Sequence, residues 1–63
     1  SEYGQDYSLE DLAAMIDVIE LNMLEAAETL DFEKAAELRD KGKQIKKYYN
    51  KAKKKYDREQ NKN

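Results

Sequence analysis

The strongest constraint on the fold is a pair of apolar seams, each of which advances along the chain in alternating steps of three and four residues. The seam residues are Leu9, Leu12, Ile16, Ile19, Met23, Ala26 and Leu30 in the first, and Ala35, Leu38, Gly42, Ile45, Tyr49, Ala52 and Tyr56 in the second. These steps place apolar side chains along one side of an α-helix. Each seam therefore predicts one amphipathic helix.

The two seams do not run on in one register, because Leu30 and Ala35 are separated by a step of five. Asp31 stands at this break and is a good N-cap, as Ser8 is for the first helix. We therefore expect an all-α fold, an antiparallel two-helix hairpin with helices at about 9–30 and 32–57 and a turn near Thr29–Phe32. A single continuous helix with a stutter is the alternative, which we favour less. Residues 1–7 are expected to be a disordered lead-in, 8–57 the hairpin, and 58–63 a frayed tail.

The composition excludes several classes of protein. The chain has no Cys, no His and no Pro. It therefore has no disulfide framework and lacks the commonest general base and metal ligand. Pairs of acids such as Asp17/Glu20 share a helix face, but nothing encloses them, so we expect no catalytic residue, no metal and no cofactor. No apolar run approaches the roughly 20 residues of a membrane helix, so we expect no membrane partner.

Charge is divided between the two predicted helices. Residues 1–33 hold ten acidic and no basic residues, whereas residues 34–63 hold twelve basic and four acidic residues, so the halves carry −10 and +8. Folded antiparallel, the two halves attract each other. A two-helix hairpin of this length still has only one interface, so its stability is marginal. We therefore expect it to bind protein or to self-associate into a dimer.

One stretch resembles a known family. Residues 19–40 read IELNMLEAAETLDFEKAAELRD, which is similar to the UVR domain, a short helical hairpin at the C-terminus of the excision repair protein UvrB. Related copies occur in UvrC, in Clp-type ATPases and in activators of the arginine kinase McsB. The matching residues are Met23, Ala26, Ala27, Leu30, Asp31, Phe32, Glu33, Ala35, Ala36, Leu38, Arg39 and Asp40.

The resemblance implies a non-catalytic docking module of bacterial nucleotide excision repair in the cytoplasm. Its expected partner is the homologous hairpin of UvrC, which would bring the nuclease to the UvrB–DNA complex. Docking in a Clp-ATPase or kinase-activator complex is an alternative. A purely structural coiled coil is another, although it leaves Phe32 unexplained.

The expected partner-binding residues surround the turn. Phe32 is the only Phe, and it is either an anchor for a partner or a staple across its own turn. Arg39 either pairs with a partner's carboxylate or forms an intrahelical pair. The complete expected set is Leu30, Phe32, Glu33, Ala36, Arg39 and Asp40.

Two features of the second helix depart from the family. Gly42 replaces an apolar residue, which is expected to leave Ile19 facing a gap and to allow a bend. A Lys-rich run with Tyr48 and Tyr49 follows, and lysines with aromatic residues suit weak nucleic-acid binding. The adjacent acidic helix, the preference for Lys over Arg and the negative net charge argue against direct nucleic-acid contact.

Overall fold

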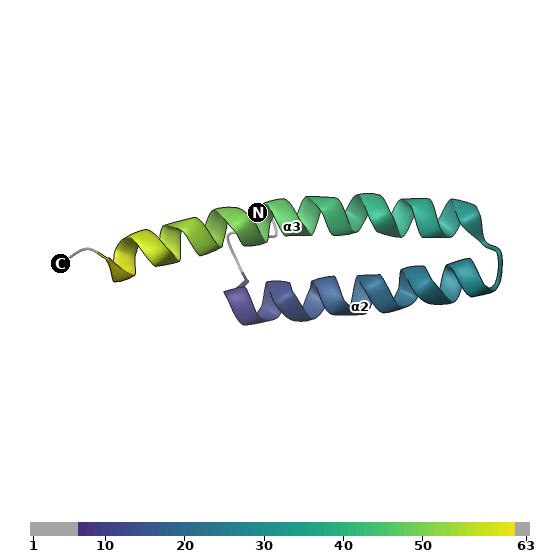
Figure 1. The fold of residues 1–63 in the computed structure, drawn as a ribbon, viewed down its shortest axis with the longest axis horizontal. Helices are drawn as coiled ribbons and strands as arrows, with labels where there is room; N and C mark the ends of the chain where they lie inside the picture. Colours follow the sequence, from purple (N-terminus) through teal and green to yellow (C-terminus); the bar gives the residue numbers. More distant parts are fainter. Residues whose placement is uncertain (1–6, 62–63) are drawn as a thin grey trace.

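The computed structural model describes residues 7–61, which form two antiparallel α-helices, α2 (Leu9–Glu28) and α3 (Phe32–Gln60). The two helices lie side by side and are joined by a tight turn at one end of the molecule (Figure 1). The all-α hairpin is confirmed, and the continuous helix is excluded. Of the expected lead-in, only Tyr7 falls within the described residues.

The start of α2 is fixed by a reciprocal cap. The backbone N–H of Asp11 donates to Ser8 Oγ at 3.0 Å, and the N–H of Ser8 donates to Asp11 Oδ2 at 3.4 Å. This capping box satisfies donors that the first turn of a helix leaves unpaired. The cap expected at Ser8 is confirmed.

The end of α2 lies two residues before the expected end, at Glu28 rather than Leu30. Leu30 has φ 62°, in the left-handed region. Its N–H donates to the Ala27 carbonyl at 3.0 Å, and the Asp31 N–H donates to the Ala26 carbonyl at 2.8 Å. These two bonds form a Schellman motif, in which a left-handed residue closes the helix.

α3 begins directly after this turn. The side chain of Asp31 accepts a hydrogen bond from the Lys34 N–H at 3.2 Å, as expected of an N-cap. The helix continues to Gln60, three residues beyond the expected end at 57. Residues 58–60 are therefore helical rather than part of the tail.

The core is a narrow strip between the helices. In the part of the chain that the structure describes, the buried apolar residues are Leu12, Ile19, Ala26 and Ile45. Half-buried neighbours pack against them, among them Ile16, Met23, Leu38 and Tyr49. The seams thus form the interface between the two helices, but the last residue of each seam does not take part in it. Leu30 is exposed because it lies on the turn. Tyr56 is exposed because this part of α3 extends beyond the start of α2.

Gly42 is buried and faces no gap. A Cβ placed on Gly42 would lie 3.3 Å from Cγ2 of Ile19. The isoleucine side chain therefore fills the space, and the missing side chain allows a close approach of the two helices. α3 remains helical through this position.

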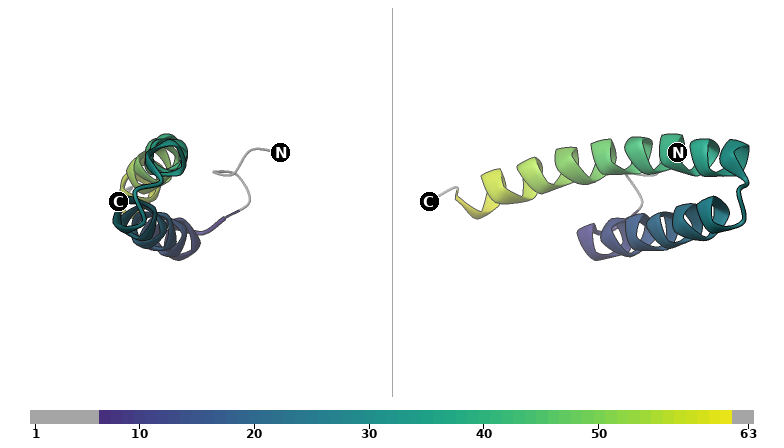
Figure 2. Two further views of the ribbon diagram at one scale, coloured as in Figure 1. Left: turned by 90° about the vertical axis from the view of Figure 1, so that its right-hand side faces the viewer. Right: turned by 45° about the vertical axis from the view of Figure 1, so that its right-hand side comes forward.

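The helices differ in length. α3 has 29 residues and α2 has 20, and because both adjoin the turn, the C-terminal part of α3 extends past the start of α2. At about 1.5 Å per residue, this overhang is about 13 Å long. Figures 1 and 2 show the yellow-green end of α3 without α2 beside it. Within residues 7–61, neither helix is long and apolar enough to cross a membrane.

Candidate functional site

Two large apolar side chains protrude at the turn. Leu30 is 71% exposed and Phe32 is 66% exposed. Leu30 occupies the left-handed position of the turn, and Phe32 is the first residue of α3. With so much of its surface exposed, Phe32 is not held as a buried staple across its own turn. The turn therefore presents apolar surface to the solvent.

The other expected residues continue from this turn along α3. Phe32, Ala36 and Arg39 are spaced by four and three residues, and Glu33 and Asp40 flank them, so these five share one side of the helix. Ala36 is half-buried, and the others are exposed. We call this surface, made of Leu30, Phe32, Glu33, Ala36, Arg39 and Asp40, the tip face. The fold thus brings together the residues that the sequence predicted.

Arg39 is engaged within its own helix. Its Nη2 and Nε atoms each lie 3.3 Å from Oδ1 of Asp40. Both side chains are more than half exposed, and an exposed ion pair contributes only about 0–1 kcal/mol. The intrahelical pairing that the sequence left open is present here, and it is weak enough for a partner's carboxylate to replace Asp40.

Three exposed apolar residues on α2 lie outside the site expected from the sequence. Val18, Leu21 and Leu24 are each more than half exposed. Val18 also lines an open groove of about 430 Å³ between the helices, together with Met15, Leu38 and Lys41. The sequence does contain a signal for them, because these apolar residues lie off the seam that forms the core.

Residues 7–61 contain no group of three or more Asp or Glu arranged to hold a metal ion. In the same range, no buried side-chain polar atom lacks a hydrogen-bond partner. The features that this part of the molecule does present are exposed apolar surface at the turn and charge along the helices.

Comparison with known proteins gives one match. The model of the family described as UvrB/uvrC motif (UVR) matches residues 13–48, which include α2 from its second turn, the turn between the helices and the first half of α3. No curated protein and no solved structure matches the chain significantly. The matched segment contains the whole tip face.

Proposed function

The chain belongs to the UVR family, and from this membership we propose that it is a protein-docking module of bacterial nucleotide excision repair. In this proposal it binds the homologous hairpin of UvrC and thereby recruits the nuclease to the UvrB–DNA complex. The tip face forms the centre of the interface. The module itself catalyses no reaction and acts in the cytoplasm.

The observation that carries the proposal is the conformation of Leu30. A left-handed backbone costs a residue with a Cβ about 1–2 kcal/mol relative to the right-handed region, and glycine occupies such helix ends far more readily. Leu30 nevertheless carries a large apolar side chain that is 71% exposed and contributes little to the hairpin's own core. Contact with a partner would explain why a large apolar side chain occupies a position whose backbone conformation is unfavourable for it.

The neighbouring residues suit such a contact. Phe32 would insert as an aromatic anchor, and residues of that kind dominate binding energy when they enter a desolvated pocket. Ala36 leaves room beside it for a partner helix. Arg39 would exchange its weak pairing with Asp40 for a carboxylate of the partner, to which a guanidinium can donate two hydrogen bonds. Glu33 would offer the reciprocal acid.

Self-association is part of the same proposal. A second copy of the chain presents the same apolar turn, Arg39 and Glu33, so two tip faces are complementary to each other about a two-fold axis. The isolated chain would then form a homodimer. Binding of UvrC would compete with that dimer for the same apolar surface.

Calorimetric titration with the homologous hairpin of UvrC tests this function. We expect saturable binding that weakens by more than about 1 kcal/mol in Phe32→Ala, the level that marks an anchor residue. Tyr56→Ala is the matched control, because Tyr56 is also an exposed aromatic residue of α3 but lies at its other end. It should bind as the unmodified chain does.

Two outcomes would contradict the proposal. If the folded chain does not bind the UvrC hairpin, the excision-repair assignment fails, and the Clp-ATPase and kinase-activator complexes become the partners to test. If Phe32→Ala and Tyr56→Ala both bind unchanged, the partner is correct but the tip face is not the interface.

A further inference from the structure

The outer side of α3 carries a continuous row of basic residues. Each lies two positions from a seam residue, which at about 100° per residue places it roughly 200° around the helix from the core. All are exposed. We call this surface the outer basic face, and its residues are Lys43, Lys47, Lys51, Lys54 and Arg58. At about 1.5 Å per residue, the row is about 22 Å long.

These cations are not neutralised by the hairpin itself. The ion pairs that basic residues of α3 make are Lys46 with Glu20 at 3.2 Å, Lys53 with Asp57 at 3.3 Å, and Arg39 with Asp40. Across residues 7–61, no ion pair involves a residue of the outer basic face. The positive charge of the row is therefore available to an external anion.

The acidic helix lies on the other side of α3. Packed helices have axes about 8–10 Å apart, and exposed charges are screened over about 8 Å at physiological ionic strength. The outer basic face points away from α2, and its C-terminal part lies on the overhang, which α2 does not reach (Figure 1). The acidic half of the chain thus weakens the local positive potential much less than the net charge of −2 suggests.

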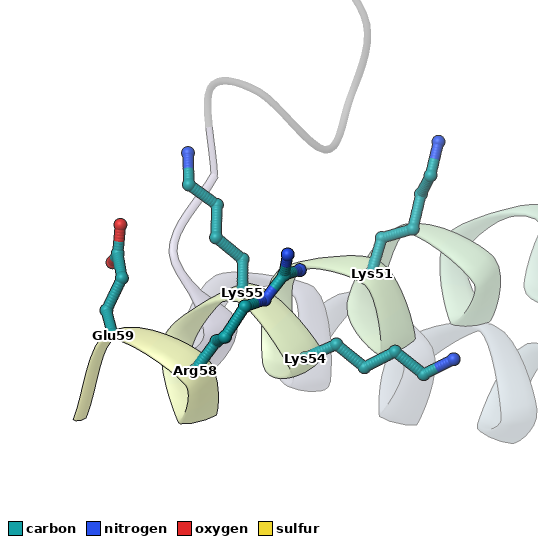
Figure 3. Close-up of a pocket in the computed structure, with 5 residues that line it drawn as sticks. All are labelled: Lys51, Lys54, Lys55, Arg58 and Glu59. Carbon is teal, nitrogen blue, oxygen red and sulfur yellow. The ribbon is translucent and has the colours of Figure 1, made fainter. Parts of the chain in front are cut away.

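The end of the row surrounds an open hollow. Lys51, Lys54, Lys55 and Arg58 line this hollow of about 600 Å³, and Glu59 is the one acid at its rim. In Figure 3 the side chains of Lys51 and Lys55 extend to the same side of α3, and the guanidinium of Arg58 lies between them. The C-terminal turns of α3 therefore carry four cationic side chains around this hollow, with their charged groups spread along the helix.

We propose that the outer basic face binds the phosphate backbone of nucleic acid without regard to sequence. The row holds no apolar side chain, whereas a protein interface needs an apolar centre and a helix on an anionic membrane needs an apolar face beside its cations. A nucleic-acid backbone needs only spaced positive charge. Tyr48 and Tyr49 are half-buried and lie off this row, so base stacking has no part in the binding.

This inference revises the expectation from sequence that direct nucleic-acid contact is disfavoured. One of the three objections was the acidic helix, and the fold places that helix on the opposite side of α3 from the outer basic face. The proposal does not depend on the docking function, because the tip face ends at Asp40 and the outer basic face, which shares no residue with it, begins at Lys43. Both faces lie on the same side of α3, and the outer basic face follows the tip face along the helix.

The test measures fluorescence anisotropy of a labelled DNA duplex titrated with the full chain at several salt concentrations. Because each phosphate contact contributes about −0.9 to the slope of log affinity against log salt, five cations predict a slope of about −4.5. The variant Lys47→Gln/Lys51→Gln/Lys54→Gln should bind at least about tenfold more weakly at low salt, with a slope about 2 to 3 units shallower.

The matched control is Lys34→Gln/Lys46→Gln/Lys53→Gln, which removes the same net charge from other sides of α3. It should retain affinity within about threefold and keep the slope. Gln and Lys have similar helix propensities, and circular dichroism verifies that both variants are helical. Lys43→Gln/Arg58→Gln is a second variant at the ends of the row, which should also weaken binding.

Three results would overturn the proposal. The first is the absence of saturable DNA binding at low salt. The second is an equal loss of affinity in the variant and the matched control, which would show that net charge rather than the outer basic face determines binding. The third is binding to phosphatidylserine vesicles without binding to DNA, which would make a membrane surface the ligand.

Discussion

Leu30 occupies a position that ordinarily favours glycine. The Schellman motif needs a residue with positive φ, and Leu30 adopts φ 62° there. The alternating steps of the seam cannot reveal this, because a leucine at the end of a seam resembles a last core residue. Its exposure and its backbone conformation became evident only from the structure.

The first prediction concerns the order of two substitutions at this residue. Leu30→Gly should be more stable than Leu30→Ala by about 1 kcal/mol, because glycine adopts positive φ without a steric cost. In a helix interior the order is reversed, and alanine is favoured by about 1 kcal/mol. Urea titrations of the helical signal at one protein concentration measure the difference. A more stable alanine variant would show that α2 continues through Leu30.

Gly42 allows a second prediction about a single residue. Gly42→Ala should change the free energy of unfolding by less than about 0.5 kcal/mol, because a gain in helix propensity of about 1 kcal/mol is offset by the contact with Cγ2 of Ile19. Gly42→Leu should destabilise the hairpin by about 1–3 kcal/mol through overpacking. Thermal unfolding of both variants measures these changes. Stabilisation by the leucine would mean that Ile19 does face a gap.

At the scale of elements, the starts of the helices followed from the sequence and their ends did not. Ser8 and Asp31 are N-cap residues whose side chains bind backbone N–H groups three positions on, and such short-range chemistry is visible in a sequence. The end of α3 has no comparable signal, because the seam stops at Tyr56 and no glycine or proline follows. The helix therefore continues to Gln60.

The third prediction compares two leucines of α2. Leu12 is fully buried, whereas Leu21 is more than half exposed. Leu12→Ala should cost about 2–5 kcal/mol, because it leaves a cavity in a core with few other contacts. Leu21→Ala should stay within about 0.5 kcal/mol. Denaturation of the two variants under the same conditions measures the contrast, and equal losses would mean that the outer side of α2 is buried in a dimer.

At the scale of the whole molecule, the hairpin is a single layer with different surfaces on its different sides. The turn is apolar, the outer side of α3 is basic, and the outer side of α2 is acidic with exposed Val18, Leu21 and Leu24. Because so little apolar surface is buried between the helices, the hairpin by itself is only marginally stable. Contacts with other molecules are therefore expected to contribute to its stability.

The antiparallel pairing could be predicted from the sequence, and so could the position of the expected partner-binding residues on one side of α3 beside the turn; their role as a binding site stays a prediction. The step of five and the cap at Asp31 indicated the turn, and helical spacing placed Phe32, Ala36 and Arg39 together. The overhang of α3 could not be predicted, because it depends on where two helices of unequal length end. That overhang separates only the C-terminal part of the outer basic face, Lys54 and Arg58, from α2, whereas the rest of the face is separated because it lies on the side of α3 opposite the seam.

The docking function is tested most directly by mapping the interface residue by residue. Nitrogen-15-labelled chain is titrated with the unlabelled hairpin of UvrC, and shifts of the backbone amide signals are followed by nuclear magnetic resonance. We expect the largest shifts at the turn and the first half of α3, around Leu30, Phe32 and Arg39, with little change near Arg58. Shifts concentrated instead at the groove around Met15 and Val18, or an unchanged spectrum, would contradict docking through the tip face.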